Sequence, residues 1–153
     1  FIVDGVELGN IELEEVPVSD ATVTGSMAWN NGDDTADKVV DGDTQTFFDG
    51  TAEGWVELDL GESVKFDVLG FAPRTGYEGR MNGGRFYGSK NGEKWEEIYV
   101  VSYAPASGMN YAILDKEYNY RYIRYDVPEG RAEGATEDYM CNIAEIALYK
   151  IKD

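Results

Sequence analysis

The stretch Trp55-Val56-Glu57-Leu58-Asp59-Leu60 decides the fold class of this chain, because apolar and polar side chains alternate along it. A period of two is typical of a β-strand that buries one face. The run Tyr120–Tyr125 alternates strictly, and Val64–Ala72 is a further apolar run that ends at Pro73. These segments predict strands rather than helices.

Further strand-like runs follow on both sides, separated by turn signals. Arg85–Ser89 precedes Lys90-Asn91-Gly92, and Asn-Gly is a strong signal for a hairpin turn. Seven or eight short strands at this spacing predict an all-β fold, an antiparallel β-sandwich or jelly roll. The remaining runs lie at Trp95–Val101, Tyr111–Leu114 and Ile143–Ile151, and one short helical turn is expected over Thr35–Val40.

The composition bounds the class of protein. The 153 residues suffice for one domain, and thirty acidic residues against thirteen basic ones give a net charge of −17. Such a surface repels nucleic acid and anionic membrane, which both need basic residues. The single cysteine, Cys141, cannot form an internal disulfide and is expected to be a buried, inert thiol. The absence of histidine removes the commonest general base.

The chain divides into two parts by composition. Residues 1–20 are acidic and only weakly alternating, and we interpret them as a linker or a leading edge segment. Residues 21–153 hold the strand runs and form the predicted β-sandwich domain. The sequence starts at Phe1, as a module excised from a longer chain would. We therefore expect this domain to be a module of a multimodular protein and monomeric as a module.

The loop Lys38–Thr46 is the segment with the clearest metal-binding chemistry. Asp41 and Asp43 place two carboxylates on a tight turn around Gly42, and Ca²⁺ takes six to eight oxygen ligands. The segment lacks the residues of an EF-hand, and a solvated acidic turn is an equal alternative from spacing alone.

Five ordered motifs lie along the chain, at Ala36–Asp49, Gly54–Gly61, Pro73–Trp95, Tyr120–Tyr125 and Asn142–Ile146. Together they resemble the discoidin, or coagulation-factor type C, domains, with the bacterial family 32 carbohydrate-binding modules as the nearest branch. The resemblance implies a discoidin-like, galactose-binding-like jelly roll and one structural calcium ion. The implied calcium ligands come from Lys38, Asp41, Asp43, Thr46, Ala144 and Glu145.

The resemblance also implies a ligand site in the loops at one end of the sandwich. The matching positions are Asn30, Asn31, Phe48, Asp49, Arg74, Tyr77, Arg80 and Tyr139, with Met140 beside the last of them. Galactose-binding members often carry a histidine at the position of Phe48, so the sugar that this chain prefers is not given by the resemblance. Trp29 is either an exposed platform or a lid on the core, and Trp55 and Trp95 are expected in the core.

These observations predict a non-catalytic carbohydrate-binding module, which targets a larger secreted or cell-surface protein, such as a bacterial glycoside hydrolase, to glycans. An adhesion module that binds a protein or a surface is the alternative. An enzyme is not expected, because no motif marks a nucleophile, a phosphate-binding loop or a catalytic pair of carboxylates.

Overall fold

The regular structure of the chain is built on β-strands. A computed structural model describes residues 2–3, 6–7, 11–128 and 140–152. The strands are β1 (Ile2–Val3), β2 (Val6–Glu7), β3 (Leu13–Val16), β4 (Thr22–Gly25), β5 (Phe48–Ala52), β6 (Trp55–Ala72), β7 (Arg85–Ser89), β8 (Glu96–Val100), β9 (Asn110–Asp126), β10 (Met140–Ile143) and β11 (Glu145–Ile151). Short 3-10 helices are η1 (Trp29–Asn31), η2 (Ala36–Val40) and η3 (Glu78–Met81).

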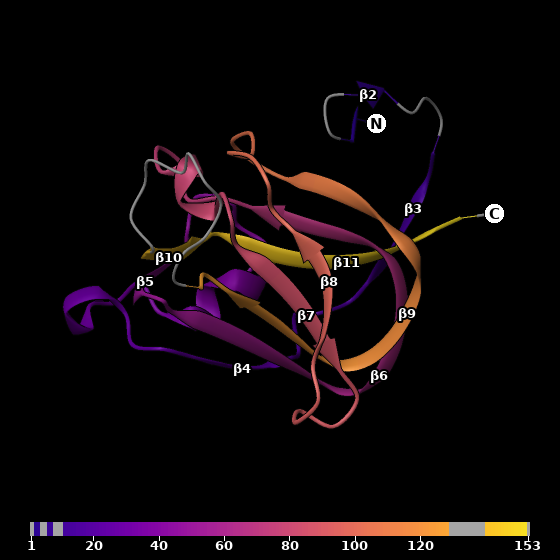
Figure 1. Cartoon of the computed structure of the whole chain (residues 1–153), viewed down its shortest axis with the longest axis horizontal. Coiled ribbons are helices and arrows are strands. Elements are labelled where there is room, and N and C mark those ends of the chain that lie inside the picture. The colour runs from indigo at the N-terminus through magenta and orange to yellow at the C-terminus, as the bar shows by residue number, and fades with distance from the viewer. Residues whose placement is uncertain (1, 4–5, 8–10, 129–139, 153) are drawn as a thin grey trace.

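Two long antiparallel strands, β6 and β9, organise the sheet. Their pairing runs from Trp55 opposite Asp126 to Phe71 opposite Asn110, with register shifts between Asp59 and Val64 and between Phe66 and Val68. Irregularities of this kind bend a strand, and Figure 1 shows β6 and β9 curving together at one side of the molecule. Each strand therefore contributes one half to each layer of the sandwich.

The other strands extend the two layers. In one layer β4 pairs with the first half of β6, and β7 pairs with the second half of β9 and with β8. In the other layer β11 pairs with the second half of β6 and with β3. The separate pair of β5 and β10 lies at one end, where Figure 1 also places η3. All of these pairings are antiparallel, so the predicted antiparallel sandwich is confirmed.

A single apolar core lies between the layers. Phe71 of one layer packs against Phe86 of the other, with ring centroids 5.5 Å apart. Cys141 is buried as predicted, and burial raises the pKa of its thiol, so the residue is inert. The largest fully buried side chains are Tyr125, Phe48, Phe66, Phe71, Phe86, Leu58, Leu69, Met81, Ile123, Ile143, Ile146 and Leu148.

Several sequence predictions need correction. Trp55–Leu60 and Val64–Ala72 were expected as two strands, but they form the one continuous strand β6 because the chain bends at a bulge instead of turning. Trp55 and Trp95 are half-buried and lie outside the core. Trp55 instead lies under the guanidinium of Arg124, 4.9 Å from its ring centroid.

The segment before residue 21 adds an edge strand to the sheet. β3 pairs with β11 through Leu13 opposite Ile151 and Val16 opposite Leu148. The division of the chain at residue 20 stays a prediction. Among the described residues, no helix is both long and apolar enough to cross a bilayer.

Gly84 allows Tyr125 to pack in the core, and we expect Gly84→Ala to destabilise the fold. A Cβ at position 84 would lie 2.2 Å from the Tyr125 hydroxyl oxygen, so the ring must shift. Overpacking of this kind costs about 1–3 kcal/mol in the free energy of unfolding. Urea denaturation measures the cost, with Ser102→Ala at an exposed position as control. Equal stability of the two variants would contradict this packing.

Candidate functional site

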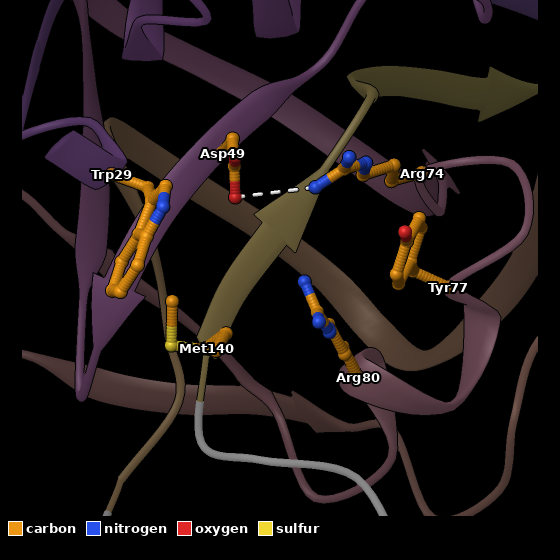
Figure 2. A pocket seen from close by; sticks show the side chains of 6 residues that line it. All are labelled: Trp29, Asp49, Arg74, Tyr77, Arg80 and Met140. Atoms are coloured by element: carbon orange, nitrogen blue, oxygen red, sulfur yellow. Dashed lines mark ion pairs between the residues drawn. The ribbon is translucent and has the colours of Figure 1, made fainter. Parts of the chain in front are cut away.

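A pocket of about 420 Å³ opens at the end of the sandwich formed by β5, β10 and η3. Figure 2 shows Asp49 and Met140 at its centre, Trp29 on one side, and the two arginines with Tyr77 on the other. Chain segments far apart in the sequence thus meet around one hollow. Its lining residues are Trp29, Asp49, Arg74, Tyr77, Arg80 and Met140.

The buried amide of Asn142 holds the polar side chains of this pocket in place. Its Oδ1 accepts hydrogen bonds from Arg74 at 3.2 Å and from Arg80 at 2.7 Å. Its Nδ2 donates to Asp49 Oδ1 at 3.0 Å, and Arg74 forms an ion pair with the same carboxylate oxygen at 3.2 Å. Asn142 is fully buried on β10, so it fixes the positions of both guanidinium groups from the interior of the protein.

Aromatic rings flank the two guanidinium groups. The Arg74 guanidinium carbon lies 4.2 Å from the Phe47 ring centroid and 4.1 Å from that of Tyr77. The Arg80 guanidinium carbon lies 4.3 Å from the Tyr77 centroid. Cation–π contacts of this length orient the guanidinium groups, and Tyr77 keeps 39% of its surface exposed.

Trp29 forms the opposite side of the pocket and is 59% exposed. It begins η1, where Asn30 and Asn31 both adopt a positive φ of 53°, a conformation that asparagine tolerates better than most residues. An isolated bridge between Ala28 and Gly50 fixes this loop to β5. Of the two alternatives left open by the sequence, Trp29 is therefore the exposed platform.

The structure brings four of the predicted ligand residues together: Asp49, Arg74, Tyr77 and Arg80. Phe48 was wrong as a contact residue. Its side chain is fully buried, because neighbouring residues of β5 point to opposite faces and Asp49 takes the outward one.

The other predicted ligand residues lie elsewhere. Asn30 is exposed on η1, and Asn31 lines a different hollow beside Thr35 and Asp37. Both asparagines have a positive φ in the turn that carries Trp29. Tyr139 lies outside the described residues.

Two important residues were not predicted for the site. Asn142 was read only as part of a motif, although an asparagine inside an apolar strand is a signal for a buried polar anchor. Trp29 was left undecided, and the pair of asparagines after it was the available signal for an exposed turn.

A second polar cluster joins the loop after η2 to the start of β11. The Asp41 carboxylate accepts hydrogen bonds from the Thr46 hydroxyl and from the backbone N–H of Asp43, the latter at 3.0 Å. Glu145 is only 6% exposed and accepts the Gly42 N–H at 2.9 Å. Burial, followed by the hydrogen bond with the Asp41 carboxyl, raises the pKa of Glu145 to about 8.

The remaining predicted calcium ligands lie around this cluster. The Asp43 carbonyl accepts the Thr46 hydroxyl at 3.1 Å, while its carboxylate accepts the N–H of Gln45 at 2.8 Å. The Lys38 carbonyl accepts the N–H of Asp41 at 3.3 Å, and Ala144 directly precedes Glu145. In the described part of the chain, no three His, Cys, Asp or Glu side chains form a metal-binding group. The cluster supplies two carboxylates plus neutral oxygens, a donor set that suits Ca²⁺ and not zinc.

The fold is the antiparallel sandwich expected of the discoidin-like domains, and it carries a polar and aromatic pocket in the loops at one end. The model of the F5/8 type C domain matches residues 20–146, and the chain belongs to this family. The predicted resemblance is thereby confirmed. Among curated proteins, none matches the chain.

Solved structures of carbohydrate-binding modules are similar to the chain. A family 62 module from Clostridium thermocellum Xyl5A is 34% identical, with a TM-score of 0.68 over 85% of this chain and 94% of the module. A family 32 module from C. perfringens NanJ, in complex with galactose, is 18% identical, with a TM-score of 0.72 over 91% of this chain and 100% of the module.

The C-terminal domain of a chitobiase from Bacteroides fragilis also shares the fold. It is 20% identical, with a TM-score of 0.69 over 92% of this chain and 100% of that domain. The family and the two carbohydrate-binding modules are non-catalytic, and the chain is classed with them, as predicted.

We expect Asn142→Ala to destabilise the protein, because it removes the buried amide that Arg74, Arg80 and Asp49 share as a hydrogen-bond partner. Loss of one partner from a buried hydrogen-bond network costs about 1–3 kcal/mol in the free energy of unfolding. Chemical denaturation tests this, with Asn119→Ala at an exposed position of β9 as control. Unchanged stability would mean that Asn142 does not anchor the pocket.

Proposed function

We propose that this domain is a non-catalytic module that binds a glycan in the pocket between Trp29 and the arginine pair. The observation that carries the proposal is the pocket itself, in which exposed aromatic rings face fixed polar groups (Figure 2). Sites for small ligands combine such apolar surfaces with a few polar groups that set orientation. A pyranose presents a matching surface, with one C–H face and a rim of hydroxyls.

The polar groups fit neutral hydroxyls better than a strong anion. The Asp49 carboxylate already forms an ion pair with Arg74, and both arginines share the Asn142 oxygen. A guanidinium group presents its N–H donors in a rigid fork, which suits two neighbouring hydroxyl oxygens of one sugar. Since Phe48 is buried and the chain has no histidine, Arg74, Arg80 and Asp49 would recognise the sugar in this module.

The relatives support a targeting role outside the cell. One solved relative is a domain of a chitobiase, and the others are carbohydrate-binding modules of bacterial proteins. We infer that this domain is likewise one module of a larger secreted or cell-surface bacterial protein, and that it directs its parent to a glycan. An adhesion module for a protein partner is less favoured, because the pocket is concave and mixes polar with aromatic groups, unlike a flat apolar patch.

We further propose a structural calcium ion at the cluster of Asp41, Thr46 and Glu145. Two carboxylates that meet where one is nearly buried repel each other when both are charged, and a bound cation would remove that repulsion. The backbone carbonyls of Lys38, Asp43 and Ala144 would complete an all-oxygen site. The ion would link the loop after η2 to β11 and so stabilise the fold, with no part in chemistry.

We expect Trp29→Ala to weaken glycan binding without unfolding the domain, because the side chain is mostly exposed. Removing a central aromatic contact costs about 2 kcal/mol, or roughly thirtyfold in Kd. A glycan array in calcium buffer identifies the sugar, and calorimetry then compares the variants. Met27→Ala, on the same loop but outside the pocket and 62% exposed, is the matched control.

A blank array for the wild-type domain would contradict glycan binding and favour the adhesion alternative. Equal affinities of the Trp29 and Met27 variants would place the sugar elsewhere on the surface.

Calcium is expected to raise the melting temperature of the wild-type domain. At a concentration a hundredfold above Kd, binding to the folded state adds about 2.7 kcal/mol, or roughly 5–10 °C for a domain of this size. Glu145→Gln should abolish the difference between calcium and chelator, whereas Glu62→Gln, at an exposed position, should keep it. Identical melting of the wild type in both buffers would exclude the ion.

A further inference from the structure

A second pocket, here called the hairpin pocket, lies at the far end of β7 from the first one. It has a volume of about 350 Å³. Arg80 precedes β7 and Lys90 follows it, and five strand residues span on the order of 17 Å. Figure 1 shows the turn between β7 and β8 projecting away from β5 and β10. The hairpin pocket is lined by Lys90, Asn91, Lys94, Trp95, Glu96 and Tyr120.

Two aromatic side chains form fixed walls of the hairpin pocket. The Tyr120 hydroxyl donates to the Glu96 carboxylate, and the ring fills the space left by Gly88, where a Cβ would lie 2.3 Å from it. Trp95 is half-buried and packs edge-on against Tyr122, with centroids 6.5 Å apart at 70°. Trp95 lies outside the core cluster, and Tyr120 packs against that cluster while only partly buried, so both rings also line the pocket.

Hydrogen bonds within the turn between β7 and β8 fix the backbone that carries the two lysines of the hairpin pocket. Asn91 Oδ1 accepts the Lys94 N–H at 3.0 Å, and Ser89 Oγ accepts the Gly92 N–H at 2.9 Å. Both Lys90 and Lys94 are exposed. Within the described residues, neither ammonium group has an ion-pair partner.

The acidic groups near the hairpin pocket do not cancel these charges. One Glu96 oxygen lies 4.0 Å from Lys116 Nζ, and the other accepts the Tyr120 hydroxyl. Glu93 is exposed on the same turn but does not line the pocket. Among the residues that line the hairpin pocket, the two ammonium groups of Lys90 and Lys94 therefore stand against the one carboxylate of Glu96, in a chain whose net charge is −17. Such a local excess of positive charge marks a surface that suits an anion.

We propose that the hairpin pocket is a second glycan site, and that it binds a sugar carrying a carboxylate, namely a hexuronate residue of an acidic polysaccharide. The aromatic side chains of Trp95 and Tyr120 pack against the pyranose ring, and the ammonium groups of Lys90 and Lys94 pair with its carboxylate. The proposal is independent of ligand binding in the first pocket. Because the two pockets lie at opposite ends of β7, the domain can contact two different sugar chains at once.

The test compares trigalacturonate with its fully methyl-esterified form, which keeps the ring and removes the charge. Calorimetry at low and physiological ionic strength measures the affinity of each probe, and NMR locates the bound probe through the amides of residues 90–96. We expect the acid to bind and the ester to bind at least tenfold more weakly. We expect the double change Lys90→Gln and Lys94→Gln to lower the affinity for trigalacturonate by about five- to tenfold.

The control variant combines Lys65→Gln with Lys152→Gln, which makes the same change in charge at exposed positions elsewhere. This variant and Trp29→Ala should both keep the wild-type affinity for the acid. No binding of the acid, equal binding of the ester, or no effect of the Lys90 and Lys94 changes would overturn the proposal. Loss of acid binding in Trp29→Ala would overturn it too, because the acid would then lie in the first pocket.

Discussion

β6 and β9 pair along almost their whole length, and the bulges in this ladder let one pair of strands serve both layers of the sandwich. Once the pair is bent, β4 and β7 attach to one half and β11 to the other. The same ladder leads β6 to Ala72, next to the end where β5 and β10 pair. The pocket-forming loops therefore lie together because the long strands end there.

At that end, one buried side chain connects the fold to the site. Asn142 is fully buried, yet its amide reaches Arg74, Arg80 and Asp49. Two guanidinium groups held this way lose little conformational entropy when a ligand binds, and preorganisation of this kind favours affinity. The net charge of −17 on the chain does not oppose a neutral sugar, whereas it would repel nucleic acid.

Much of the fold and part of the site could be predicted from the sequence. Alternation around Leu58 and Ile123 identified central strands, but a bulge carries no strong local signal, so the continuity of β6 was missed. Arg74, Tyr77 and Arg80 were found through family motifs. Phe48 was misassigned because a motif position does not say which face of a strand a residue takes, and Asn142 was overlooked because its partners come from distant segments.

Glycan recognition in this pocket depends on contact of Arg74 and Arg80 with a sugar. The most direct test follows the arginine Nε–Hε and tryptophan indole resonances by NMR while neutral mono- and oligosaccharides are added in turn. At least one sugar should shift the signals of Arg74, Arg80 and Trp29 together and leave those of Arg85 and Arg121 unchanged. Glycan binding in this pocket is excluded if no sugar moves these signals, or if only the distant arginines respond.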